Sequence, residues 1–600
     1  MSADPARTQP GTAAGAARTA ALGLPFFEDF AGQREGSPNA ARWETNGGVL
    51  VNERFSLGPP SRGMATFDGL NGRGQSYGPP AAYSNTDTLT SLPIDLSGGQ
   101  PTDRTYLSFF WQAGSIVGAP SANSSSRRVN LQLEFLDNTG AWNSVWDQNS
   151  QGIRTDFKQE FIAVDQAKYL HAGFRFRFRA SGSQFGTRDT WNLDYILLDR
   201  NRATTNVSYA DVVLSAPLSS LLKRYAAMPS WQFNAAPNPT QELNDSTFST
   251  FNNLDVGAVP PTPFQYQGSV QVLPAGNVVT SATVTPSPPP APGTRQLYVG
   301  YSVRALPVAI PAGPSRVRHN LYLSLLNAPT DPRRAPNDTV RRITEFSNYF
   351  AYDDGTAEGT NNLRQSEVRA TSRAIRFELN RPDQIDSLRY YYAGATAASG
   401  VPVPPSVTIT FAVWEVGPDG LPAAQPKATK SVNLPTTVTS PGYRGVKFDR
   451  PVSVSGRFFI GYLQPVTPLF VQFGADLNSR QPRDTFYDNE TGAWVPFGNR
   501  SFVPMLRPYM SGVVSSAHNA AANAALRVYP NPTQGLLQVS GARYSRAVAL
   551  DALGRTVWEQ PAAEAGKSQL DLRTLRAGVY LLRFTLPDGS VSTQRLVLQP

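Results

Sequence analysis

The chain has 600 residues, which is too long for a single hydrophobic core, since cores stop growing near ~250–300 residues. Proline and glycine number 51 and 48, whereas charged residues make up only 16%, which excludes a coiled coil, a helical repeat array and a charge-rich disordered chain. The lack of cysteine excludes disulfide scaffolds and thiolate metal sites, and the thinly spread net charge of +9 gives no reason to expect a nucleic-acid partner.

The first 23 residues are predicted to form a disordered N-terminal segment. They are rich in Ala, Gly and Thr, carry Arg7 and Arg18, and lack the apolar core of about 7–15 residues that a signal peptide needs. No stretch of the sequence approaches the ~18–20 consecutive apolar residues of a membrane helix, so no membrane span is predicted.

Residues 24–200 alternate between apolar and polar side chains with a period of two. Phe174, Phe176 and Phe178 alternate with arginines, and the odd-numbered residues from Trp191 to Leu197 share one face. Half-buried strands of this kind pack as two facing sheets. The pattern predicts a jelly-roll β-sandwich.

Two further sandwiches are expected before a low-complexity linker at 513–525. Residues 201–330 are predicted to be immunoglobulin-like, with a helix at Pro217–Met228, and residues 331–512 to be another β-sandwich. Strands are expected in the second unit at 264–273, 277–284 and 296–303.

The tail, residues 526–600, contains about seven short strands separated by turns, which predicts a small β-sandwich. Its motifs are Tyr529-Pro-Asn-Pro-Thr-x-Gly535, Asp551-Ala-Leu-Gly-Arg555 and Leu575-x-x-Gly-Val-Tyr580, followed by a final strand at Gln594–Leu598. In this order they resemble the C-terminal sorting domain of type IX secretion substrates (type A, Por secretion system). The motif residues are Tyr529, Pro530, Asn531, Pro532, Gly535, Gly554, Gly578 and Tyr580.

The predicted fold class is therefore all-β: tandem jelly-roll and immunoglobulin-like sandwiches followed by a sorting domain. The resemblance implies recognition by the type IX secretion machinery and a secreted or outer-membrane cell-surface location. It also implies removal of the tail, with release of the body or its attachment to lipopolysaccharide. Such proteins first cross the inner membrane, so the missing signal peptide departs from the family. A misplaced start of the sequence is the preferred explanation; the alternatives are a trimmed signal and a protein that stays inside the cell.

The first unit is also similar to cleaved-adhesin and MAM-like jelly rolls of bacterial surface proteins. The similarity lies in Phe26–Phe30, Trp43, the segments 89–96 and 106–111, and Asp194–Leu198. It implies a structural calcium ion held by an acid of the first strand and an acid of the last, here Glu28 and Asp194, since oxygen ligands suit this cation. The alternative is that both carboxylates are solvated or cap neighbouring amides.

A second, weaker calcium candidate lies in the Gly-containing turn of the third unit. Asp353, Asp354 and Glu358 supply carboxylates there, although such acids also cap turns through Asx bonds. No other cofactor is expected.

Catalytic constellations are scarce in the sequence. His171, His319 and His518 lie far apart, and no HExxH, GxSxG, phosphate-binding or dinucleotide motif occurs. The sequence also lacks the spaced pair of catalytic acids that jelly-roll glycosidases carry. Candidate sugar-stacking aromatics are Tyr390, Tyr391, Tyr392, Trp142, Trp146 and Trp494.

The prediction for the whole chain is an exported, non-catalytic protein that mediates adhesion or binds a glycan or protein. The alternative is a secreted hydrolase acting on polysaccharide or protein through an unrecognised site. A third possibility is a structural component of a surface layer or of the gliding apparatus.

Overall fold

A computed structural model describes residues 7, 21–79, 81–257, 261–274, 276–304, 306, 309–326, 331–363, 368–397, 400–479, 484–496, 502–512, 526–551, 555–561, 566–587 and 591–600. These residues form two compact units. The larger unit, called the body here, takes in most of residues 21–509, and the smaller holds the tail together with the short segments 381–386 and 450–456. The fold is nearly all-β, as the alternation predicts.

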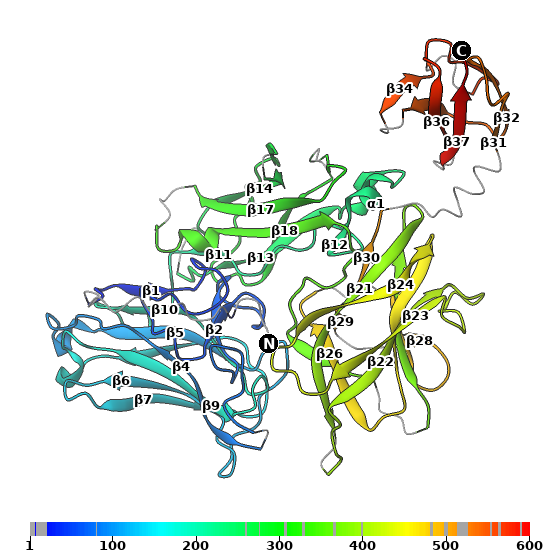
Figure 1. Cartoon of the computed structure of the whole chain (residues 1–600). Coiled ribbons are helices and arrows are strands. Elements are labelled where there is room, and N and C mark those ends of the chain that lie inside the picture. Colours follow the sequence, from blue (N-terminus) through cyan, green and yellow to red (C-terminus); the bar gives the residue numbers. More distant parts are fainter. Residues whose placement is uncertain are drawn as a thin grey trace. The chain divides into compact units, whose positions relative to one another are not determined.

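The first sandwich consists of two antiparallel sheets (Figure 1). Their facing sides bury one aromatic core, in which the rings of Phe109 and Phe178 meet edge to face with centroids 4.8 Å apart. Phe174, Phe176 and Phe178 are fully buried, which confirms the alternation. One sheet has the order β2(Leu50–Asn52)-β3(Met64–Phe67)-β10(Trp191–Asp199)-β5(Tyr106–Ala113)-β8(Lys158–Ala163), with β1(Phe26–Glu28) on β10. The other has the order β4(Tyr83–Thr90)-β9(Phe176–Ser183)-β6(Asn130–Leu136)-β7(Trp142–Asn149).

The second sandwich packs a three-stranded sheet on a five-stranded one, with the rings of Phe251 and Phe264 stacked between them at 4.5 Å. The smaller sheet has the order β11(Val212–Leu214)-β13(Ser246–Asn253)-β16(Leu297–Ser302). The larger has the order β12(Ala227–Pro229)-β18(Thr339–Ser347)-β17(Ser315–Leu325)-β14(Phe264–Leu273)-β15(Val278–Thr280). Because β18 lies beyond residue 330, this sheet is longer than the sequence suggests, and the domain boundary itself stays a prediction.

The helix predicted at Pro217–Met228 is wrong. Residues 217–226 are irregular, and α1(Ser230–Asn234) is the one α-helix among the described residues. The amides of this segment bond to distant carbonyls: Lys223 N donates to Glu242 O and Ala226 N to Ala351 O. Its leucines are buried by neighbouring strands, so their helix-like spacing reflects tertiary packing and not a helical face.

The third sandwich has two six-stranded sheets. Its core includes Tyr390 and Phe411, whose ring centroids lie 4.2 Å apart. One sheet has the order β19(Gly359–Asn361)-β26(Leu469–Asp476)-β21(Asp383–Ala397)-β24(Gly442–Val454), with β29(Val503–Pro504) on β26 and β30(Leu506–Met510) on β21. The other has the order β23(Ala428–Pro435)-β22(Ser406–Glu415)-β25(Arg457–Gln464)-β20(Thr371–Glu378)-β27(Phe486–Asn489)-β28(Val495–Pro496).

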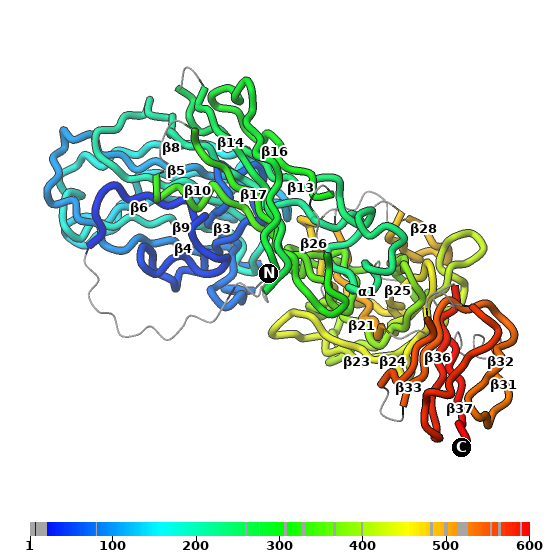
Figure 2. The backbone as a smooth tube through the Cα atoms, turned by 90° about the horizontal axis from the view of Figure 1, so that it is seen from above, coloured from blue at the N-terminus to red at the C-terminus, as the bar shows by residue number. Residues whose placement is uncertain are grey.

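The tail has seven described strands in two sheets, as predicted, and in Figure 2 β33, β36 and β37 run side by side. Its core is small and is centred on Leu582, Phe584 and Leu596, all fully buried. One sheet has the order β31(Leu526–Tyr529)-β32(Leu536–Gly541)-β35(Gln569–Asp571), and the other β34(Thr556–Glu559)-β33(Arg546–Leu550)-β36(Gly578–Thr585)-β37(Val591–Leu598). The predicted linker at 513–525 lies outside the described residues.

Candidate binding cavity

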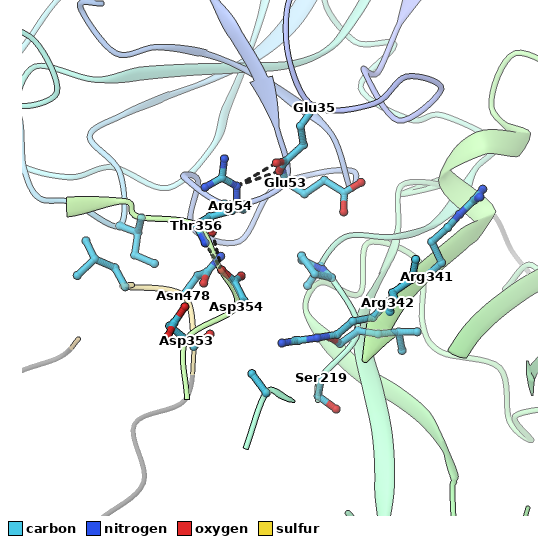
Figure 3. A pocket seen from close by; sticks show the side chains of 18 of the residues that line it. Glu35, Glu53, Arg54, Ser219, Arg341, Arg342, Asp353, Asp354, Thr356 and Asn478 are labelled. Atoms are coloured by element: carbon cyan, nitrogen blue, oxygen red, sulfur yellow. Dashed lines mark hydrogen bonds and ion pairs between the residues drawn. The ribbon is translucent and has the colours of Figure 1, made fainter. Parts of the chain in front are cut away.

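A cavity of about 980 Å³ lies where the three sandwiches of the body meet. This volume is at the upper end of the range typical of small-molecule sites. Each sandwich supplies one wall, and the polar residues of the walls approach one another from segments far apart in the sequence (Figure 3). We call it the three-walled cavity.

The wall from the first sandwich carries Glu35, Glu53 and Arg54. The Arg54 Nε lies 3.1 Å from both carboxylate oxygens of Glu35, and Arg62 Nε lies 3.2 Å from Glu53 Oε1. Burial raises the pKa of Glu53, and the positive charge of Arg62 opposes the rise. Both carboxylates of this wall are therefore engaged by arginines.

The wall from the third sandwich carries Asp353, Asp354 and Thr356. Asp353 forms an ion pair with Arg507 and accepts a hydrogen bond from the Tyr443 hydroxyl. The Asp354 Oδ1 accepts hydrogen bonds from the amide and the hydroxyl of Thr356, at 2.9 and 2.6 Å. This is the Asx turn that the sequence offers as the alternative to calcium binding.

Glu358, the third acid of that candidate calcium site, is fully buried and forms an ion pair with Arg54 at 2.6 Å. Its other oxygen accepts a hydrogen bond from Leu477 N. Burial and the charges of Asp354 and Glu358 raise the pKa of Asp476 well above its usual range. A calcium ion on Asp353, Asp354 and Glu358 stays a prediction.

The wall from the second sandwich carries three arginines and one acid, Glu345. Arg316 lies on β17, and Arg341 and Arg342 lie on β18. The Arg342 Nη1 donates a hydrogen bond to Leu218 O at 3.0 Å. Within the described residues, the structure places no carboxylate within ion-pair distance of Arg316 or Arg341. We call these three residues the arginine wall.

Glu28 and Asp194, the first pair of candidate calcium ligands, are brought to the same end of the pairing between β1 and β10. Both are buried and accept protein hydrogen bonds: Glu28 from Phe30 N and Trp43 Nε1, and Asp194 from the amide and hydroxyl of Ser61. In the described part of the chain, no group of three or more His, Asp or Glu side chains is arranged to hold a metal ion. Calcium at Glu28 and Asp194 stays a prediction, which chelation would test.

The predicted sugar-stacking tyrosines are not available for stacking, because Tyr390, Tyr391 and Tyr392 are all at least 95% buried. An exposed aromatic pair lies elsewhere: Phe248 on β13 is 44% exposed and Tyr298 on β16 is 70% exposed. In the sequence the immediate neighbours of Phe248 are Thr and Ser, and Tyr298 follows Leu297, so no local pattern marks either residue as exposed.

The two described histidines, His171 and His319, lie in different sandwiches and do not share a site. His171 Nε2 lies 3.2 Å from Leu136 O, and His319 is fully buried in the second sandwich, where burial lowers its pKa to about 4. His518 lies outside the described residues.

The motif at the start of the tail ties the last strand in place. The Asn531 Nδ2 donates a hydrogen bond to Arg595 O at 2.6 Å, and Asn531 Oδ1 accepts one from Val597 N at 2.9 Å. Gly535 has a positive φ of 109° and no room for a side chain, because a Cβ atom would lie 2.7 Å from the side chain of Arg573. Tyr580 donates to Arg576 O, while Gly554 lies outside the described residues.

Residues 527–599 match the family described as the secretion system C-terminal sorting domain. This confirms the resemblance found in the tail. The chain is a substrate of type IX secretion and is delivered to the cell surface or the extracellular space. None of the helices in the described parts of the chain has the length and apolar character that a membrane crossing requires.

No curated protein matches the sequence. Among solved structures, the chain is similar to the K1 cleaved adhesin domain of Lys-gingipain from Porphyromonas gingivalis W83, with 15% identity over 30% of this chain and 99% of that one, at a TM-score of 0.19. It is also similar to an arabinose-bound MgGH51 α-L-arabinofuranosidase, with 16% identity over 31% of this chain and 28% of that one, at 0.21. A third similar structure is the N-terminal CBM22-1–CBM22-2 tandem domain of Paenibacillus barcinonensis Xyn10C. The identity is 9% over 76% of this chain and 98% of that one, and the TM-score is 0.17. These TM-scores are too low to indicate a ligand for this chain.

Proposed function

We propose that this exported chain is a non-catalytic binding protein that recognises a glycan in the three-walled cavity. The observation that supports this most is the composition of the walls: hydroxyls, amides and guanidinium groups line a space large enough for several sugar rings. Ser219, Thr250, Gln296 and Asn478 offer the donors and acceptors that sugar hydroxyls need.

The carboxylates of the cavity favour binding over hydrolysis. Glycoside hydrolysis needs a general acid with a raised pKa and a second carboxylate free to act as base or nucleophile. Here Glu35 and Asp353 are held in arginine pairs, and Glu345 accepts a hydrogen bond from Tyr349. Glu53, whose pKa is raised, also lies beside an arginine, and Asp354, which has no ion pair among the described residues, accepts hydrogen bonds from Thr356.

The test uses the full chain on an array of immobilised polysaccharides and, in parallel, assays of reducing-sugar release and of casein cleavage. We expect retention on at least one polysaccharide without release of sugar or peptide. Turnover that is abolished by Glu53→Gln would instead establish a hydrolase. The absence of retention on every polysaccharide would disprove glycan binding.

A further inference from the structure

The exposed aromatic pair lies on the sheet face that continues into the three-walled cavity. Thr250, which lines the cavity, is directly opposite Tyr298 in the pairing of β13 with β16. Phe248 lies two residues from Thr250 on the same face of β13, since side chains alternate along a strand. Its amide donates a hydrogen bond to the hydroxyl of Ser219, which also lines the cavity.

A glycine allows the two rings to meet. Gly300 is the residue opposite Phe248, and a Cβ atom there would lie 2.8 Å from the Phe248 Cβ and 2.2 Å from the Thr247 carbonyl. Without that atom, Phe248 and Tyr298 meet edge to face with their centroids 5.2 Å apart and their planes at 87°. Despite this contact Tyr298 remains 70% exposed.

The C-terminal end of β13 contacts the first sandwich. The Asn252 Nδ2 donates hydrogen bonds to the carbonyls of Pro59 and Pro60, at 2.8 Å each. Gln296, which lines the cavity, donates to Asn252 Oδ1. One sheet face thus runs from a fixed contact between sandwiches, through the cavity, to two exposed rings.

We propose that the aromatic pair and the arginine wall bind one ligand, an anionic polysaccharide. This rests on the proposed glycan-binding function and names its ligand class. A pyranose ring stacks its apolar C–H face on an aromatic ring such as Tyr298. The guanidinium groups of Arg316 and Arg341, for which the described residues provide no ion pair, bind uronate or sulfate groups of the same chain.

Several observations favour a polysaccharide over other anions. The aromatic pair lies outside the cavity, so a ligand that contacts both it and the arginine wall must be extended and must offer apolar ring faces as well as charge. Two acids lie near the arginine wall: Glu345, which is directly opposite Arg316 in the pairing of β17 with β18 and accepts a hydrogen bond from Tyr349, and Glu53, whose pKa burial raises against the opposing charges of Arg62 and Arg341. Among the described residues neither acid lies within ion-pair distance of Arg316 or Arg341, so an incoming anion can bind these guanidinium groups without breaking an ion pair.

The experiment compares polygalacturonate with fully methyl-esterified pectin, which has the same backbone without the charge, and adds chondroitin sulfate as a sulfated chain. The full chain is immobilised, and binding is measured at about 0.05 and about 0.5 M salt. We expect tighter binding of the two acidic chains than of the ester, and a loss of that preference at high salt, because exposed charges are screened.

Substitutions test the roles of the arginine wall and of the aromatic pair separately. In Arg316→Gln/Arg341→Gln the preference for the acidic chains should disappear, whereas Arg128→Gln, an exposed arginine outside the cavity, should retain it. Tyr298→Ala should weaken binding of acidic and esterified chains alike by about tenfold. Phe185→Ala removes another exposed aromatic ring, which is 52% exposed, and should leave binding unchanged.

The possible outcomes distinguish the ligand class, the role of the aromatic pair and the proposed function from one another. Equal binding of polygalacturonate and its ester by the unaltered chain would overturn the anionic ligand class while leaving glycan binding intact. Unchanged binding by Tyr298→Ala, in a variant that melts like the parent, would overturn the role of the aromatic pair. If neutral polysaccharides bind and none of the acidic chains does, this inference fails alone; if nothing on the array binds, the proposed function fails with it.

Discussion

Arg54 in the first sandwich and Glu358 in the third form an ion pair of 2.6 Å, and both side chains are buried. The two residues are 304 positions apart in the sequence. Arg54 also binds Glu35, so one guanidinium connects a wall of the three-walled cavity to the neighbouring sandwich. The shape of the cavity therefore depends on this pair.

Replacing Arg54 with methionine should destabilise the body by about 3–5 kcal/mol, because it leaves the carboxyl of Glu358 buried without its cation. The free energy of unfolding, measured by denaturant titration, checks this. Glu415→Gln breaks the exposed pair with Lys427 and should cost less than ~1 kcal/mol. A loss for Arg54→Met no larger than that of Glu415→Gln would show that the buried pair does not hold the sandwiches together.

The titration of Asp29 should lower the stability of the body as the pH rises from about 4 to about 7, whereas His319, whose pKa burial lowers to about 4, acts in the opposite sense below about 6.5. Burial and the neighbouring charge of Glu28 raise the pKa of Asp29 to about 7, although Ala31 N and Asn337 donate hydrogen bonds to its carboxylate. Over this range the folded protein keeps a proton on Asp29 that the unfolded chain has lost, so the contribution of Asp29 to the free energy of unfolding decreases with pH. In Asp29→Asn the difference between unfolding at pH 5 and at pH 7.5 should be smaller. Identical pH profiles for the two proteins would contradict the shifted pKa.

Gly300→Ala should separate the aromatic pair and cost about 1–3 kcal/mol, because the new methyl group overlaps Thr247 O and Phe248 Cβ. Polysaccharide binding should weaken together with the melting temperature. Gly442→Ala is the matched control, since a Cβ atom there has nothing within 4 Å. Normal stability and binding in Gly300→Ala would show that the strands can spread without loss.

Export should depend on the small core of the tail. Leu582 is fully buried, and its neighbour Leu581 is 44% exposed on the opposite face of β36. Leu582→Ala should cost about 2–5 kcal/mol, a large share of the stability of so small a domain. Leu581→Ala should cost much less. The fraction of the chain found outside the cell measures the effect; equal export of the two variants would show that the machinery does not need a folded tail.

Much of the fold could be predicted from local patterns. Phe174, Phe176 and Phe178 alternate with arginines in the sequence, and in the structure they are fully buried. The tail was predictable because its turn residues and strands follow one another within 75 positions, so that Asn531 and Val597 come together inside one small domain. A strand's period and a turn's residue type are local properties, and a sequence displays them directly.

Predictions from local patterns were wrong where burial depends on contacts between distant parts of the chain. The spacing of Leu218, Leu221 and Leu222 imitates a helix, yet these side chains are buried by strands from other parts of the chain. Three consecutive tyrosines suggest that at least one is exposed, but Tyr390, Tyr391 and Tyr392 are all buried in the third sandwich. Burial depends on what packs against a strand, and a strand's own residues do not specify its neighbours.

The sequence by itself determined the all-β class and the sorting signal for export, because both depend on patterns among residues that are close together in the chain. Only the tertiary structure decided which residues line the three-walled cavity. Glu53, Arg341 and Asp353 belong to three different sandwiches, and the exposure of Tyr298 depends on a missing side chain at Gly300. Contacts between distant segments are set by the packing of whole sheets, so no local pattern records them.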